Sequence, residues 1–156
     1  MRQSIINHKN VRLVPFQWFH PHLMDLRPFE RALMRDIPNY DYRLKMFEAE
    51  GGAVSAMVGN KIACCFGAIK YWPGVAECWM LTGKQVADYP VTLTRSAKRY
   101  FDDLMHIQKL HRLQITVDTA NDLAIRWANA LQFRQEGLMR QYGVDRSDHA
   151  IYARYS

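Results

Sequence analysis

Cysteine is scarce in this sequence, and the cysteines present are not spaced for cross-linking or for holding a metal. The chain contains 3 cysteines, Cys64, Cys65 and Cys78, and no C-x-x-C pair. Neither a disulfide framework nor a zinc knuckle is therefore predicted. All three cysteines lie in apolar, strand-like segments, which favours buried free thiols in a reducing compartment.

Long apolar runs and the common nucleotide and hydrolase motifs are also missing. No stretch approaches the roughly 20 apolar residues that span a membrane. Met1–Asn10 has no apolar core of the secretory type, so a cytoplasmic protein is expected. G-x-S-x-G, Walker and G-x-G-x-x-G motifs do not occur. His20 and His22 form the only close histidine pair, without a carboxylate at ligand spacing, so no metal site is predicted.

The composition is that of a globular protein. The chain has 156 residues, of which 49% are hydrophobic and 12% aromatic, and a single domain over residues 1–156 is expected. The net charge of +6 favours acidic partners such as nucleic acid, CoA phosphates or an acidic protein. Because no Lys/Arg run is long enough for a nucleic-acid tail, nucleic acid is the weakest of these.

Hydrophobic periodicity predicts alternating strands and helices. The first helix is amphipathic, with apolar positions from Leu23 to Met34 and with Glu30 among its polar positions, and the long helix is capped by Thr92 or Thr94. The predicted order is a strand over 11–16, this first helix, a helix over 42–49, strands over 53–58, 61–72 and 75–82, a loop over 84–91, the long helix to Ile107, a strand over 113–117, a helix over 124–131, and strands over 133–142 and 149–155. Such an order indicates an α/β fold with a mixed sheet.

The element order and the last third of the chain resemble the GNAT acyltransferase superfamily. Many GNAT proteins share a segment of the form strand, Asn, helix, Leu-Gly-Phe, strand. The corresponding residues are Gln114–Val117, Asn121, Ala124-Ile125, Leu131-Gln132-Phe133 and Arg134–Arg140. The resemblance implies a mixed, mostly antiparallel central sheet flanked by helices, with acetyl-CoA as cofactor beside the helix that Asn121 opens.

A narrower resemblance, over roughly residues 54–155, is to the internal virion protein A family of short-tailed phages. It is carried by Cys78–Thr82, Gln85-Val86, Ser96–Arg99, Asn121 and Ile125–Trp127. This resemblance implies a phage-encoded protein made in the host bacterial cytoplasm and packaged in the virion or linked to its assembly. Its partners would be virion components or a host protein.

The GNAT resemblance also locates a pyrophosphate turn, R/Q-x-x-G-x-G/A, at Thr92–Ala97. No glycine occurs there, since Arg95 replaces the first glycine and Ala97 fills the last position. Arg95 could pair with phosphate directly, or it could be a solvated helix residue beside a turn that no longer binds CoA. The predicted cofactor-binding residues are Thr82, Thr94, Arg95, Ser96, Ala97 and Asn121.

The acid and base of the GNAT reaction have weaker candidates. The usual tyrosine position corresponds to Ala128, so Tyr142 or Tyr100 would have to replace it unless both are core or rim aromatics. Glu77 is the best base candidate, and an ordinary strand-end carboxylate is its alternative interpretation. Asn121 lines the cofactor cleft or simply caps its helix.

Two functions follow from these residues. The first is a GNAT-fold accessory or virion-associated protein with a degenerate acyl-CoA site, acting mainly by binding. The alternative is an active acetyl-CoA-dependent N-acetyltransferase with a non-standard pyrophosphate loop. A homo-oligomer is compatible with either function.

Overall fold

The computed structural model describes residues 11–156. Met1–Asn10, and with them the prediction about a secretory signal, lie outside the described residues. The strands are β1 (Val11–Pro15), β2 (Val54–Val58), β3 (Lys61–Trp72), β4 (Val75–Thr82), β5 (Arg112–Asp118), β6 (Arg134–Met139) and β7 (His149–Tyr155). The helices are α1 (Pro28–Asp36), α2 (Tyr40–Glu50), α3 (Pro90–Ile107) and α4 (Asp122–Ala130), with short 3-10 turns at His20–Leu23 and Lys84–Ala87.

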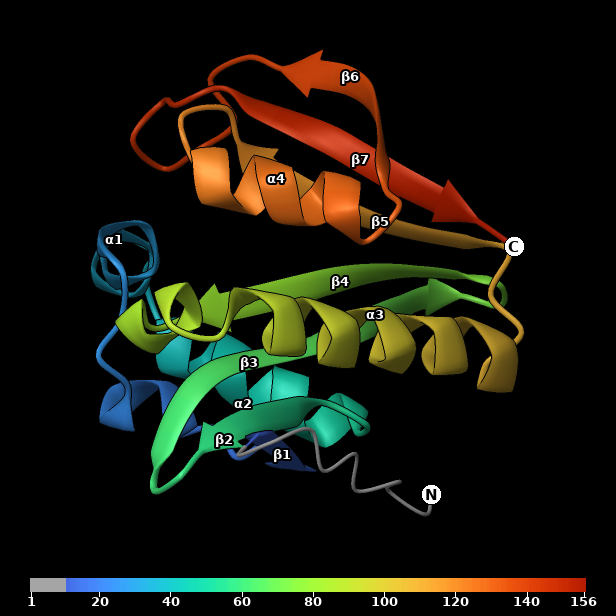
Figure 1. The fold of residues 1–156 in the computed structure, drawn as a ribbon. Helices are drawn as coiled ribbons and strands as arrows, with labels where there is room; N and C mark the ends of the chain where they lie inside the picture. Colours follow the sequence, from blue (N-terminus) through green and yellow to red (C-terminus); the bar gives the residue numbers. More distant parts are fainter. Residues whose placement is uncertain (1–10) are drawn as a thin grey trace. The chain divides into compact units, whose positions relative to one another are not determined.

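The strands form a 7-stranded sheet in the order β1-β2-β3-β4-β5-β7-β6. Strands β1, β2 and β3 pair antiparallel in sequence, as do β5, β7 and β6, while β4 pairs with β5 in parallel. Figure 1 labels this arrangement along the chain. The predicted α/β class with a mixed, mostly antiparallel sheet is confirmed, and so is the predicted order of elements.

The chain divides into two compact units. Among the described residues, unit 1 comprises residues 11–69 and Trp79–Ser96, and unit 2 comprises Lys70–Cys78 and Ala97–Ser156. The division falls within continuous elements, because β3, β4 and α3 each contribute residues to both units. The single domain over residues 1–156 stays a prediction.

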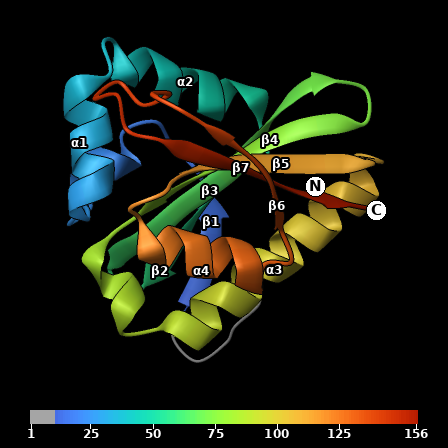
Figure 2. The same cartoon turned by 90° about the horizontal axis from the view of Figure 1, so that it is seen from above.

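Unit 1 has a core of aromatic rings between its sheet and α2. The Trp79 ring stacks on Phe47 at a centroid distance of 4.3 Å, and Phe16 approaches Trp79 edge-on at 5.0 Å. A Cβ at Gly67 would lie 2.6 Å from the Cβ of Ala53 and 3.1 Å from the Trp79 ring, so this close packing requires glycine. Helices α1 and α2 follow one another and contact each other (Figure 2).

Unit 2 is organised around the β5-β7-β6 ladder, against which α4 packs on β5. Phe101 and Phe133 meet edge-to-face at 6.4 Å, and both are buried. Arg154 links two elements of this unit, since it pairs with Asp102 of α3 and donates to the Leu131 carbonyl at 3.1 Å. The arginine thus closes the end of α4 against β7.

The first helix begins later than the periodicity predicts. It starts at Pro28, and Leu23, placed on its apolar face from the sequence, is 68% exposed. The reason is local: the residue before a proline is disfavoured in the α region, and Arg27 is extended with φ −70 and ψ 158. Proline then suits the first helical position, where no amide hydrogen is needed.

Two other boundaries also differ from the prediction. Helix α3 starts at Pro90, inside the predicted loop, so neither Thr92 nor Thr94 is its cap; Thr94 Oγ1 instead donates to the Pro90 carbonyl at 2.6 Å. Strand β6 ends at Met139, because Gln141 has a left-handed φ of 54 that breaks the extended backbone. Tyr142 therefore lies outside the strand.

The prediction of buried free thiols is confirmed. Cys64, Cys65 and Cys78 are all free and buried. Burial raises the pKa of each thiol, that of Cys65 to about 12. None of the helices in the described part of the chain is long and apolar enough to cross a membrane.

We expect Gly74→Ala to destabilise the fold more than Gly59→Ala. Both glycines have a left-handed φ, +91 and +59, but a Cβ at Gly74 would lie 2.3 Å from the His111 ring, whereas one at Gly59 would meet nothing within 4 Å. The left-handed backbone costs about 1–2 kcal/mol in either variant, and overpacking adds roughly 1–3 kcal/mol at Gly74. Urea unfolding measures both losses. Equal losses would show that His111 moves aside without cost.

Candidate functional site

A buried carboxylate lies where α1 meets the end of β4, both in unit 1. Residues 25–27 run beside residues 82–84: Leu26 bridges to Gly83, the Arg27 amide donates to the Thr82 carbonyl at 3.2 Å, and the Lys84 amide donates to the Asp25 carbonyl at 2.8 Å. These bonds fix the start of α1. The third helical residue, Glu30, is thereby turned toward Thr82.

Glu30 is only 5% exposed and is held by two polar neighbours. Thr82 Oγ1 donates to Glu30 Oε1. Arg27 Nη1 donates to Thr82 Oγ1 at 3.4 Å and lies 3.7 Å from Glu30 Oε1. Within the described residues, the second oxygen, Glu30 Oε2, has no hydrogen-bond partner.

The environment of Glu30 changes its acidity. Burial raises the pKa of this carboxyl above its ordinary value, and the smaller opposing effects come first from the Thr82 hydroxyl, then from the backbone of Glu30 itself and the Arg27 charge. A buried carboxylate with a perturbed pKa and an unused oxygen is characteristic of functional sites. Glu30 was assigned to the polar face of its helix from the sequence. That assignment is wrong, because the helix starts at Pro28 and the Glu30 side chain is buried against Thr82.

The predicted cofactor residues of α3 lie in its first two turns. Arg95 is exposed, whereas Ser96 and Ala97 are buried, and Ser96 Oγ has no partner in the described part of the chain. The Leu93 amide already donates to the Tyr89 carbonyl at 3.0 Å. Helical geometry leaves the amides ahead of it, those of Val91 and Thr92, without an intrahelical acceptor. Arg95 is one turn beyond Val91 on the same side of the helix.

The predicted base, Glu77, is part of a polar network in unit 2. Tyr71 Oη donates to Glu77 Oε2 at 2.5 Å, and Gln114 Nε2 donates to Glu77 Oε1 at 3.4 Å. Arg112 donates to Gln114 Oε1 at 2.9 Å and to Glu136 Oε2 at 2.7 Å. Glu77 therefore links β4 to β5 through side chains that already use both of its oxygens.

The predicted acid, Tyr142, belongs to a different group at the other end of β5. Its ring lies 5.2 Å from that of His149, and His149 Nε2 lies 3.2 Å from Ser147 Oγ and 3.9 Å from Asp118 Oδ2. Asp118 is four residues beyond Gln114 along β5, which corresponds to about 13 Å. Unit 2 therefore does not bring Tyr142 and Glu77 together.

Asn121 and Ala128, the two α4 positions that the GNAT resemblance singles out, serve the helix itself: one caps it and the other is buried in its packing. Asn121 Oδ1 accepts from the Ala124 amide at 3.3 Å, so Asn121 is the N-cap of α4, as one of its two interpretations predicted. Ala128, at the position of the GNAT tyrosine, is 3% exposed and has no ionisable group. Among residues 11–156, no group of three or more His, Cys, Asp or Glu side chains is placed to hold a metal.

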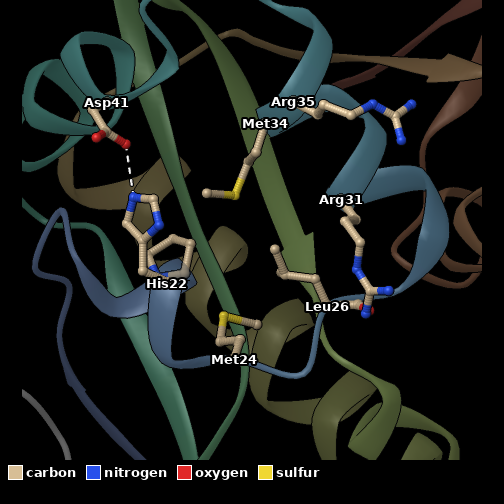
Figure 3. Close-up of a pocket in the computed structure, with 8 residues that line it drawn as sticks. His22, Met24, Leu26, Arg31, Met34, Arg35 and Asp41 are labelled. Carbon is tan, nitrogen blue, oxygen red and sulfur yellow. Dashed lines mark hydrogen bonds and ion pairs between the residues drawn. The ribbon is translucent and has the colours of Figure 1, made fainter.

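A pocket of about 320 Å³ opens in unit 1, beside the segment that holds Glu30. Its lining residues come from the His20–Leu23 turn, the segment leading into α1, α1 itself and α2: Pro21, His22, Met24, Leu26, Arg31, Met34, Arg35 and Asp41. His22 Nε2 and Asp41 Oδ1 are 2.7 Å apart across its rim. Figure 3 shows this pair on one side of the pocket and the two arginines on the other, with the methionines between them.

Comparison with known proteins identifies the fold. Neither a protein-family model nor a curated protein matches the sequence. Solved acetyltransferases do match in structure. A GNAT-family acetyltransferase from Bacillus anthracis has a TM-score of 0.70 at 15% identity, over 94% of this chain and 95% of that one. The Ard1 protein of Thermoplasma volcanium has a TM-score of 0.72 at 16% identity, over 94% and 97%.

A third structure carries ligands. The microcin C7 self-immunity acetyltransferase MccE, solved with acetyl-CoA and AMP, has a TM-score of 0.69 at 11% identity, over 96% of this chain and 94% of that one. The chain therefore has the GNAT acetyltransferase fold, which confirms the predicted fold. These findings contain no support for the phage internal virion protein resemblance.

We expect the stability of the protein to carry a pH dependence that Glu30→Gln removes. Because burial raises the pKa of folded Glu30 above its ordinary value of 4.5, the folded state binds more protons than the unfolded state between these two values. The Glu30 contribution therefore lowers stability as pH rises through that window and is level below it. Urea unfolding of wild type and variant from acid to neutral pH measures this difference. Asp103→Asn, which removes an exposed carboxylate, should leave the pH dependence of wild type in place.

Proposed function

We propose that this chain is an acyl-CoA-dependent N-acyltransferase in which Glu30 is the proton acceptor. The observation that carries the proposal is the buried Glu30 carboxyl, hydrogen-bonded to Thr82 at the end of β4. The GNAT fold supports the reaction class, since neighbours of this fold are acetyltransferases and one was solved with acetyl-CoA. Fold alone does not establish activity, so the argument depends on these residues.

The start of α3 fits the phosphates of CoA. Helix N-termini bind anions because their first amides lack intrahelical acceptors, and Val91 and Thr92 provide two such amides at the start of an 18-residue helix. The exposed Arg95 guanidinium would add a charged contact from the next turn. Acetyl-CoA, when bound, supplies an acyl group activated as a thioester.

The other predicted cofactor residues would act less directly. Ser96 and Ala97 are buried and would shape the inner side of α3, and Thr94 is engaged with the Pro90 carbonyl. Asn121 would act as the cap that fixes α4. We therefore assign the main phosphate contact to Arg95.

Glu30 would accept the proton that the attacking amine loses. A carboxylate with a raised pKa is a stronger base than an ordinary one and is better matched to an amine near neutral pH. Thr82 would hold the carboxylate in one orientation, while Arg27 would offset part of the cost of burying its charge. Tyr142 as proton donor and Glu77 as base stay predictions.

A second candidate function is binding without catalysis, as a phage-encoded accessory that contacts a virion or host protein. Two observations favour the absence of catalysis in this candidate function. Ala128 provides no acidic hydrogen at the usual tyrosine position. The amides of Gly83, Lys84, Val86 and Asp88, in the segment before α3, all donate to carbonyls of the protein itself. The segment is thus less open to an anion than a glycine-rich turn.

Acetyl-CoA should raise the thermal midpoint of the wild-type protein. A ligand at 100 times its dissociation constant adds about 2.7 kcal/mol of stability. We expect Arg95→Gln to weaken binding roughly fivefold, the upper value for an exposed ion pair. Arg99→Gln, which removes an exposed charge one turn further along α3, should bind as wild type does. No shift of the wild-type midpoint at millimolar acetyl-CoA would exclude the transferase and favour the binding function.

Glu30→Gln should lower kcat by about 10²–10⁴-fold, the usual contribution of general acid–base catalysis. Glu77→Gln should stay near wild type, because its carboxylate already accepts from Tyr71 and Gln114. Thiol release from acetyl-CoA with a panel of amines measures both rates. The midpoint shift with acetyl-CoA should be unchanged in either variant. A large loss in Glu77→Gln with Glu30→Gln unaffected would reverse the assignment.

A further inference from the structure

We propose that the unit 1 pocket is a separate ligand site for a small apolar zwitterion of dipeptide size. This ligand site is distinct from the proposed acyl-transfer site, because Glu30 does not line the pocket. Its volume of about 320 Å³ falls at the lower end of the range for small-molecule sites, about 300–1,000 Å³. The ligand class follows from the separation of apolar, acidic and basic side chains around it.

The floor of the pocket is apolar and adaptable. Met24, Met34 and Leu26 line it, and methionine side chains fill irregular spaces against varied apolar groups. The position of Met24 is fixed by a contact with the core, since the buried Cys65 thiol donates to its sulfur at 3.6 Å. Met34 is half-buried and packs against the core of unit 1, and its side chain points into the space between the two polar rims (Figure 3). The floor therefore suits an apolar side chain.

One rim of the pocket is basic. Arg31 and Arg35 are four residues apart on α1, so they share a face of the helix. Arg31 donates to the Leu26 carbonyl at 3.0 Å, and Arg35 donates twice to Asp36 at 2.7 and 3.0 Å. Each guanidinium has five N–H donors, so both retain donors for a carboxylate. Two carboxylates offset these arginines, because Asp36 pairs with Arg35 and Asp25 lies 3.7 Å from Arg31. Lys84, 3.6 Å from Asp25, leaves the group with a net positive charge.

The opposite rim is acidic. Among residues 11–156, Asp41 accepts a hydrogen bond from His22 through Oδ1 alone, and its carboxylate is more than half exposed. A carboxylate has about four acceptor positions in all, so an ammonium group can be received beside His22. A ligand with an apolar body, an ammonium at the Asp41 rim and a carboxylate at the arginine rim satisfies all three parts. Zwitterionic apolar dipeptides have this composition.

The proposal is tested with leucyl-phenylalanine and two matched derivatives, without acetyl-CoA. N-acetylation removes the ammonium, and C-terminal amidation removes the carboxylate, while the apolar body stays the same. Isothermal titration should give saturable binding of the free dipeptide at millimolar concentration or below. We expect each derivative to bind roughly fivefold more weakly, as the loss of one exposed ion pair predicts.

Variants assign each end of the ligand to its rim. Arg31→Gln with Arg35→Gln should weaken the free dipeptide but leave the amide unchanged, and Asp41→Asn should weaken the free dipeptide but leave the N-acetyl form unchanged. Arg43→Gln, on the exposed side of α2 away from the pocket lining, should bind all three ligands as wild type does.

Three results would overturn the proposal: no saturable binding, equal affinity for all three ligands, or a variant effect that is the same for every ligand. The comparison of ligands on wild type holds even where a variant fails to fold. Because acetyl-CoA is absent, these outcomes are independent of whether the chain transfers acyl groups.

Discussion

The short antiparallel contact between residues 25–27 and 82–84 is the constraint on which unit 1 depends. It joins the segment before α1 to the end of β4 through backbone hydrogen bonds. Burying an ionisable carboxyl costs several kcal/mol unless polar partners meet it, and Thr82 and Arg27 are those partners for Glu30. The same contact fixes Leu26 in the wall of the pocket. The carboxyl site and the pocket therefore share one structural support.

Two prolines give the candidate site its form. Pro28 keeps Arg27 extended, so that the chain pairs with β4 before the helix starts. Pro90 starts α3 early, which places Arg95 within the helix and leaves the amides of Val91 and Thr92 at its end. In the proposed phosphate site, two backbone donors and a side-chain cation at this helix start would take the place of a glycine-rich turn.

Unit 2 shows how polar residues at suggestive positions can be structural. Glu77 has the residue type and strand position of a base, yet Tyr71 and Gln114 occupy its oxygens. Asn121 caps α4 through the Ala124 amide. Hydrogen bonds of this kind satisfy buried or half-buried groups and need no substrate to explain them. Glu30 differs because one of its oxygens is left without a partner in the described residues.

The amino-acid sequence by itself determined the order of elements, the α/β class and the buried thiols, and it offered the Asn121 cap as one of two interpretations. Periodicity, turn residues and cap residues are local signals, so they can be recognised without tertiary contacts. The burial of Glu30 depended on tertiary structure, because a glutamate between apolar positions resembles a solvated helix residue until Thr82, 52 residues away in sequence, is placed beside it. The same holds for the engagement of Glu77 and for the separation of Asp41 from Arg31 across the pocket. Long-range pairing decided these features, and a single sequence carries no direct signal of which distant side chains will meet.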